Sequence, residues 1–277
     1  MRFLGEAGCA PYGDSPGRLY DQSTAAHNTL TVDGREQAAI LDEWRWSSHV
    51  IPQVRRWISA PTHDFFHGVH EGYYQYRQDE TLHARKVFFL KGEYWVVLDW
   101  LESSGAHDYQ AYFHGLVPGT IDGSAILLGE GPRLAILPPA EDALTLTKVD
   151  DPGLTAYLEE RKLDPACHPA FRYETHAAST CLTWLLLPQA SSAPLPAVRR
   201  IPVTVNGLDE DAHGATALEI RFPEYTDYLC VSHKDFDGEM EFAGMTAWGF
   251  LTFRRVNAAG KVLLAIEQTM GDGVCGR

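Results

Sequence analysis

The sequence predicts an all-β protein, a large antiparallel β-sandwich of two sheets. Short apolar runs rich in Val, Leu, Ile and aromatic residues recur along the chain, separated by clusters of Gly, Pro, Asn and Asp. Continuous apolar runs of this length are typical of strands covered on both faces, as in the core of a sandwich. Helical spacing occurs only in one short stretch, residues 153–163 (GLTAYLEERKL).

The first predicted strand follows His27 and Asn28. Residues 29–32 alternate in the manner of a strand, and Asp33-Gly34 is a strong hairpin-turn signal. His27 and Asn28 therefore stand at the mouth of a strand, where a rigid scaffold can aim a side chain outward. Simple capping of the strand end explains the same pair without any chemistry.

Two more polar groups lie in the first third of the chain. Residues 62–76 (THDFFHGVHEGYYQY) crowd four polar side chains before a tyrosine pair: His63, Asp64, His67 and His70, then Tyr73 and Tyr74. The tyrosines fit a proton-donating cluster, an aromatic sugar platform or plain strand packing. In residues 81–90 (TLHARKVFFL), His83 and Arg85 share one face of a predicted strand, because alternate strand residues point the same way.

The remaining strands are predicted in order along the chain. KVFFLKGEYWVVLDWL folds into a hairpin about Lys91-Gly92, and AILLGEGPRLAILPP repeats the plan about residues 129–131. Further strands are expected at residues 181–188, 217–222, 227–233, 246–256 and 261–269. Residues 1–277 are predicted to form one domain, with a possible minor boundary near residues 189–198, where PQASSAPLPAV reads as a loop.

Charge is unevenly distributed along the chain. The net charge is −14, of which residues 1–91 carry −1 and residues 92–277 carry −13. Such an acidic body argues against nucleic acid and against anionic membranes as partners. Eight of the twelve histidines lie between His27 and His114, which indicates that any chemistry sits in the near-neutral first third.

Neither thiol chemistry nor a membrane span is indicated. The five cysteines are scattered without metal-site spacing, which excludes a recognisable disulfide framework or thiolate site. No apolar run approaches the roughly 20 residues that span a bilayer, and no signal peptide is visible at the N-terminus. No GxSxG motif or phosphate-binding glycine loop occurs.

A metal site is one interpretation of the histidines. Two imidazoles and one carboxylate suffice for a zinc ion that keeps an open position, and His27, Asp64 and His83 offer that set. Asp42 is a second candidate for the carboxylate. The alternative is a group of surface histidines at a strand edge.

The order of these motifs resembles the heparinase II/III-like family. The matching blocks are GEAGCAPYG, YDQSTAAHNTLTVDGREQ, DFFHGVHEGYY, LHARKVFFLKGEYWVVLD and GAHDYQAYFHGLVPG, over residues 5–119. Members are polysaccharide lyases that cleave uronate-containing glycans such as glycosaminoglycans and alginate. They join an N-terminal α/α toroid to a C-terminal β-sandwich, and the resemblance covers the sandwich alone. It therefore implies a lyase part that is inactive without the toroid.

The resemblance also implies roles for particular residues. A zinc ion on the sandwich would be bound by His27, Asp64 and His83. Asn28 and Arg85 would contact the uronate, and Tyr73 or Tyr74 would be the catalytic tyrosine. Some members carry a catalytic histidine just before this block, where Ala25 and Ala26 stand here.

The expected partners are an acidic polysaccharide or oligosaccharide and a toroid domain, in the same polypeptide or as a separate chain. The resemblance implies a periplasmic or secreted location. Two rival functions stay open: a non-catalytic glycan-binding or structural sandwich, and an unrelated metal-dependent β-barrel enzyme. The second lacks the compact multi-histidine strand motif that it would need.

Overall fold

The computed structural model describes residues 1–13, 15–42, 44–47, 50–73, 81–190, 192–234 and 237–272. Its elements up to residue 137 are α1 (Pro16–Gln22), a 3-10 turn η1 (Thr24–Ala26), β1 (Leu30–Val32), β2 (Ile40–Asp42), β3 (Arg45–Trp46), β4 (Gln53–Ser59), β5 (His63–His70), β6 (Leu82–Leu90), β7 (Tyr94–Glu102), β8 (His107–His114), β9 (Gly119–Asp122), β10 (Ala125–Leu128) and β11 (Pro132–Leu137). The later elements are β12 (Thr145–Lys148), α3 (Pro152–Arg161), β13 (Ala170–Ala177), β14 (Thr180–Ala190), β15 (Ala197–Arg200), β16 (Val203–Val205), β17 (Leu208–Glu210), β18 (Ala215–Arg221), β19 (Tyr225–Ser232), β20 (Gly238–Phe242), β21 (Met245–Gly249), β22 (Leu251–Asn257) and β23 (Val262–Gln268).

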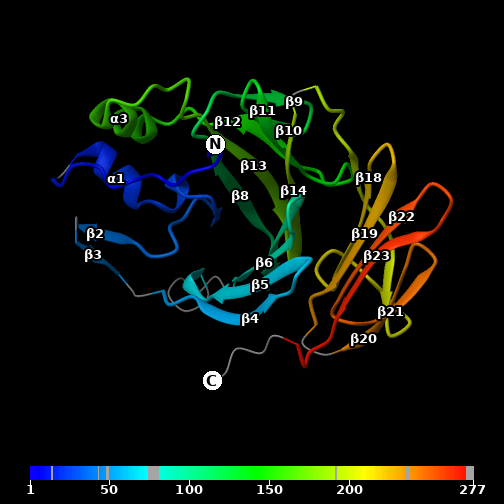
Figure 1. Ribbon diagram of the computed structural model, residues 1–277. Helices are drawn as coiled ribbons and strands as arrows, with labels where there is room; N and C mark the ends of the chain where they lie inside the picture. The colour runs from blue at the N-terminus through cyan, green and yellow to red at the C-terminus, as the bar shows by residue number, and fades with distance from the viewer. Residues whose placement is uncertain are drawn as a thin grey trace.

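The strands form a stack of antiparallel sheets, which confirms the predicted all-β sandwich (Figure 1). An eight-stranded sheet runs in the order β4-β5-β6-β7-β14-β11-β10-β9, and a five-stranded sheet in the order β15-β18-β19-β22-β23. These two pack face to face around one apolar core that includes Phe88, Leu185 and Phe253.

Each of these two sheets is covered on its other face. The sheet β1-β8-β13-β12 packs on the eight-stranded sheet through Tyr109, Tyr173 and Trp184. The sheet β17-β16-β20-β21 packs on the five-stranded sheet through a core that includes Val205 and Met240. Central strands of these two sheets, such as β14 and β18, are covered on both faces, so their sequences read as continuous apolar runs rather than alternating ones.

The hairpin of β6 and β7 forms as predicted. Gly92 has φ +81°, a left-handed conformation that glycine adopts without strain, and its turn sets the register so that Arg85 lies opposite Asp99. The turn at Asp33-Gly34 also forms, with positive φ at both residues and a bridge between Val32 and Arg35.

One prediction about the strands is wrong. Residues 246–256 were expected to form one strand, but they divide into β21 and β22, which belong to different sheets. Gly249 has φ +128°, and a Cβ atom there would lie 2.2 Å from the carbonyl oxygen of Gln268. This close approach requires glycine, and it marks the point where the chain changes sheets.

The predicted helix is α3, and it lies beside α1 at one end of the molecule (Figure 1). Asp151 caps α3 by accepting bonds from the backbone of Gly153 and Leu154. Tyr20 of α1 packs against Tyr157 of α3. The two helices thus fix the segment that leads into His27.

The minor boundary expected near residues 189–198 falls between the end of β14 and the start of β15. All strands from β15 onward belong to the five-stranded sheet and to the sheet β17-β16-β20-β21. None of the helices within the described part of the chain has the length and apolar character needed to cross a membrane.

Candidate functional site

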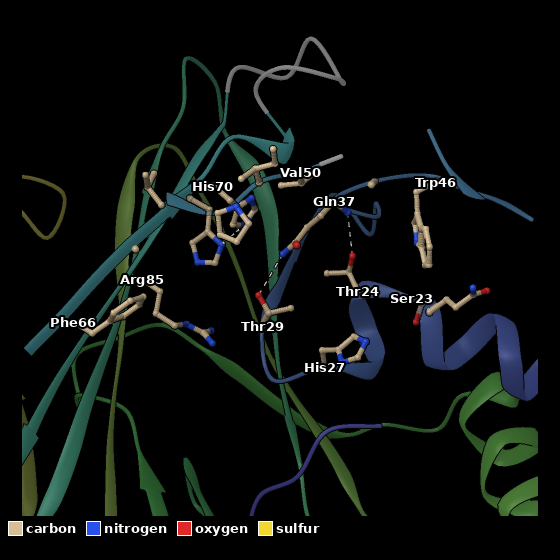
Figure 2. Close-up of a pocket in the computed structure, with 17 residues that line it drawn as sticks. Ser23, Thr24, His27, Thr29, Gln37, Trp46, Val50, Phe66, His70 and Arg85 are labelled. Carbon is tan, nitrogen blue, oxygen red and sulfur yellow. Dashed lines mark hydrogen bonds between the residues drawn. The ribbon is translucent and has the colours of Figure 1, made fainter. Parts of the chain in front are cut away.

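A cavity of about 630 Å³ opens where strands β5 and β6 of the eight-stranded sheet meet the segments around His27 and Trp46 (Figure 2). Its wall includes Phe66, His70, His83 and Arg85 from the sheet. The other lining residues are Gln22, Ser23, Thr24, His27, Thr29, Gln37, Ala38, Trp46, Val50, Ile51, Pro52, Gly68 and Val69. We call this cavity the histidine pocket. Its lining combines aromatic side chains with hydroxyl, amide and cationic side chains.

Strand alternation selects which residues of β5 and β6 reach the pocket. His70 lies directly opposite His83 in the β5–β6 register, and Arg85 lies two residues further along β6 on the same face. The shared face predicted for His83 and Arg85 is confirmed, because both side chains reach Asp99 of β7.

A chain of hydrogen bonds runs from the pocket wall into the sheet. The backbone N–H of Gly72 donates to His70 Nδ1 (3.2 Å), and His70 Nε2 lies 2.9 Å from His83 Nδ1. His83 Nε2 lies 2.8 Å from Asp99 Oδ1. One set of neutral tautomers satisfies every bond: His70 donates to His83, and His83 donates to Asp99. Both ring nitrogens of both histidines are then engaged.

Asp99 is the buried anchor of this chain. Its side chain is fully buried, and Arg85 binds it through Nε (2.7 Å) and Nη2 (2.9 Å). Burial alone would raise the pKa of this carboxyl, but the adjacent Arg85 guanidinium and His83 hold it well below its ordinary value. Asp99 therefore stays ionised and fixes the orientation of Arg85.

Arg85 keeps donors for a ligand. Asp99 takes two of its five N–H groups, and the backbone carbonyl of Asn28 accepts a third at 2.5 Å. Among the described residues no further partner takes the other two, and the side chain is 30% exposed at the pocket. The guanidinium can thus offer two fixed donors to an anionic group.

His27 supplies a second positive charge. Its Nδ1 lies 2.7 Å from a carboxylate oxygen of Glu6, and its Nε2 lies 3.1 Å from the carbonyl oxygen of Asp21. Both partners accept, so the ring donates to both only as the imidazolium. The hydrogen bond to Glu6 accordingly raises the pKa of His27.

Asn28 enters the site through its backbone rather than its side chain. Its amide nitrogen donates to Gly5 and Glu6, and its amide oxygen accepts from the backbone of His114 at 2.8 Å. These bonds tie the N-terminal segment to β8 and hold the carbonyl that orients Arg85. The side chain predicted to bind substrate is therefore engaged within the fold.

The structure does not bring the three predicted zinc ligands together. His27 and His83 line the same pocket, but Asp64 lies opposite Phe89 at the other end of β5 and pairs with Lys91 at 2.9 Å. Asp64 lies six positions before His70 on β5, about 20 Å away at 3.3 Å per residue. Asp42, the other candidate, is bound to Arg45 at an exposed hairpin.

The hydrogen bonds also leave the predicted set without lone pairs for a metal. His27 donates from both nitrogens, and His83 is engaged by His70 and Asp99. Within the described parts of the chain, no three His, Cys, Asp or Glu side chains form a group that could hold a metal ion. The arrangement does not fit zinc on His27, Asp64 and His83, and the zinc cofactor itself stays a prediction.

The predicted catalytic tyrosines do not gain support. Tyr73 is fully buried, and its hydroxyl donates to the carbonyl oxygens of Leu30 (3.0 Å) and Arg35 (3.3 Å), so it acts as a packing residue. Tyr73 is not placed to donate a proton to a ligand, because its hydroxyl does not line the pocket. Tyr74 lies outside the described residues.

Sequence reasoning missed His70, Asp99 and Trp46 as site residues. Asp99 had a visible signal, since it interrupts the apolar run VVLDWL of a predicted central strand. His70 had none beyond its place among other histidines, because its position opposite His83 depends on the pairing of β5 with β6. Trp46 stands 41% exposed beside the pocket, on the short strand β3.

Comparisons of the sequence and of the fold with known proteins both find heparinase-type proteins. A family model described as "Heparinase II/III-like, C-terminal" matches residues 1–204. Among solved structures, heparan sulfate lyase HepC from Pedobacter heparinus is similar at a TM-score of 0.58 and 14% identity, over 90% of this chain and 34% of that one. A crystal structure of heparinase III is similar at a TM-score of 0.53 and 12% identity, over 89% of this chain and 33% of that one.

At these identities the structural likeness shows the fold alone. This chain spans about a third of the length of those structures. No curated protein matches the sequence.

Proposed function

The chain belongs to the heparinase II/III-like family through its C-terminal domain, and from this premise we propose that it is the β-sandwich part of a polysaccharide lyase. Its substrate would be a uronate-containing glycan, of the glycosaminoglycan type or of the alginate type. The structural neighbours named as heparan sulfate lyase and heparinase III favour the glycosaminoglycan type. A periplasmic or secreted location, where such glycans are met, is part of the same proposal.

The observation that carries the proposal is the fixed cationic wall of the histidine pocket. β-Elimination beside a uronate requires that the carboxylate be neutralised, that the C5 proton be removed and that the leaving oxygen be protonated. Arg85, oriented by Asp99, offers two donors suited to a carboxylate or sulfate group. Trp46 and Phe66 supply apolar surface against which a sugar ring can pack.

The pocket supports substrate binding better than proton transfer. His27, His70 and His83 have both ring nitrogens engaged. Burial, together with the neighbouring His83 and Arg85, lowers the pKa of His70 to about 3, so that this ring stays neutral. We therefore assign proton transfer to groups outside this chain, on an α/α toroid domain in the same polypeptide or in a partner.

Two measurements on the purified chain test this function. Calorimetric titration with heparan sulfate and alginate oligosaccharides should show saturable binding, and carboxyl-reduced versions of the same oligosaccharides should bind more weakly. Ultraviolet absorbance should show no unsaturated uronate product from the chain alone. Absence of binding to every uronate oligosaccharide would contradict the proposed site, and robust elimination would contradict the assignment of proton transfer.

A non-catalytic glycan-binding or structural module is the second candidate, favoured by the same engaged histidines. It predicts the same binding without product. The two are separated by adding a toroid domain to the assay, in one polypeptide or as a separate chain. Product formation that depends on Arg85 then supports the lyase, and continued absence of product supports the binding module.

A further inference from the structure

A second cavity lies on the opposite face of strands β5 and β6. Its volume is about 380 Å³, and it opens between the β4–β7 end of the eight-stranded sheet and the segment that follows β19. His67 and Lys86 point into it, one residue away from Gly68 and Arg85, which face the histidine pocket. We call this second cavity the cationic pocket.

A β-bulge brings two arginines to the same rim. The β4–β5 register shifts between Val54 and Arg56, so that Val54 pairs with Gly68 while Arg56 pairs with His67. Neighbouring strand residues normally point to opposite faces, but the extra residue lets both Arg55 and Arg56 line the cavity. Bulges of this kind re-aim side chains, and they occur often beside binding sites.

The two arginines are held differently. Arg56 is buried and donates to the backbone carbonyls of Met270 (3.0 Å) and Asp272, with its guanidinium 4.7 Å from the ring centre of Phe250. Arg55 is exposed, and within the described parts of the chain it has no hydrogen bond or ion pair. Arg56 is therefore a fixed wall of the cavity, whereas Arg55 is available at its mouth.

Lys86 places a further ammonium group at the inner end. Its side chain is 4% exposed, and Nζ donates to Nδ1 of His233 at 2.8 Å. His233 in turn lies 3.0 Å from the hydroxyl of Thr216, which fixes the neutral ring with Nε2 as the donor. Burial and the charges of Lys86 and Arg200 lower the pKa of His233, in agreement with this assignment.

Positive charge dominates the described lining of the cavity. Arg55, Arg56, Lys86 and Lys234 line it against one carboxylate, Glu102, and Lys234 is itself paired with Glu210. This excess stands out on a chain whose net charge is −14. The pKa of His67 is lowered to about 3, first by burial and then by the positive charges of Lys86, Arg55 and Arg56. A positive cavity in an acidic protein concentrates anions locally.

We propose that the cationic pocket binds an oxyanion, namely a sulfate, phosphate or carboxylate group that Arg55, Arg56 and Lys86 contact together. Arginine guanidinium groups match the geometry of such groups, and a lysine adds a point charge. The anion is either a free ion or a substituent on an acidic glycan, which present the same chemistry to these residues. The site faces away from the histidine pocket, and the proposal does not depend on the proposed lyase function.

Calorimetric titration at constant ionic strength tests this site on the whole chain. Sodium sulfate, sodium phosphate and a sulfated uronate oligosaccharide are the probes. At least one of these probes should bind saturably. Arg55→Gln should weaken that binding by up to roughly tenfold, the loss expected for one charge-assisted contact. Arg55 makes no hydrogen bond or ion pair with the described residues, so this variant should fold normally. Arg221→Gln, with a guanidinium 59% exposed on β18, is the matched control and should bind as the wild type does.

Competition then identifies the source of the anion. Displacement of sulfate by the oligosaccharide in a manner that Arg55→Gln weakens supports a glycan substituent, and sulfate or phosphate binding without displacement supports a free ion. Either result supports the site. No saturable binding of any probe, or equal binding by Arg55→Gln and Arg221→Gln, would overturn it.

Discussion

On one face of strands β5 and β6 lie His70, His83 and Arg85, and on the other face lie His67 and Lys86. On the first face Arg85 donates two hydrogen bonds to Asp99, whose negative charge balances that of the guanidinium. On the second face Lys86 is held by a neutral histidine, and the described lining contains one carboxylate. The same two strands thus carry one site in which an arginine is paired with a carboxylate and another in which several cationic side chains lie together.

This difference shows what a single step of strand alternation achieves. Arg85 and Lys86 are consecutive, yet they serve different cavities because successive side chains point to opposite faces. An arginine that a carboxylate holds in one orientation suits selective recognition of one group on a sugar. A cluster of cations suits attraction of anions of several kinds.

Removing Asp99 should break the comparison most severely. In Asp99→Asn the partly exposed Arg85 and the buried His83 lose their carboxylate, and breaking a pair whose carboxylate is fully buried costs about 3–5 kcal/mol. Urea unfolding measures the loss. Glu102→Gln, on the same strand but exposed, is the matched control and should change the free energy of unfolding by less than about 0.5 kcal/mol. Equal stability of the two variants would show that Asp99 does not anchor the site.

Acid should remove the same contribution without mutation. The pKa of Asp99 is depressed in the folded state, so its stabilisation is present above the unfolded-state value, about 3.9, and is lost as pH falls toward the folded-state value. The stability difference between the wild type and Asp99→Asn should therefore be full near neutral pH and shrink below about pH 4. Urea unfolding across this range checks it, and a difference independent of pH would contradict the assignment.

The pair of His27 and Glu6 should show the opposite pH dependence. The folded-state pKa of His27 is raised, so its stabilisation is present below about 6.5 and is lost as pH rises through the folded-state value. Glu6→Gln should lower the pKa of His27 measured by NMR. Asp108→Asn, beside the exposed His176, is the control and should leave it unchanged. An unchanged His27 pKa in Glu6→Gln would contradict the imidazolium assignment.

Zinc content sharpens the description of the histidine pocket. Because Asp64 lies about 20 Å along β5 from His70 and pairs with Lys91, Asp64→Asn should not alter the metal content of the protein. Elemental analysis of both proteins after expression in zinc-supplemented medium gives the result. Loss of zinc in a folded Asp64→Asn variant would show that Asp64 is a ligand and that the strand register here is wrong.

The fold was largely predictable because its elements have local signals. Apolar runs and the turn at Lys91-Gly92 define β6 and β7, and period-two alternation puts His83 and Arg85 on one face. The sandwich was also visible in the continuous apolar runs, whereas the two further sheets that cover it were not. The break at Gly249 was not, because it depends on the approach of the Gln268 backbone from another strand.

The site was less predictable because it depends on register and hydrogen bonding. Nothing local indicates that His70, and not Asp64, would lie opposite His83 in the β5–β6 register, or that the Tyr73 hydroxyl would donate to the carbonyl of Leu30. The cationic pocket depends on a bulge beside Arg55, and the sequence around it shows no distinctive feature. Contacts between strands decide these features, so they become visible only in the structure.

The central claim is that the histidine pocket binds an acidic sugar chain, and paired tryptophan variants test it most directly. Trp46 is 41% exposed beside the pocket, whereas Trp248 is 56% exposed on β21, outside the residues that line it. Calorimetric titration with one heparan sulfate oligosaccharide should show that Trp46→Ala weakens binding by roughly two- to tenfold, the effect of one aromatic contact, while Trp248→Ala binds as the wild type does. Equal affinity of both variants and the wild type would contradict the account.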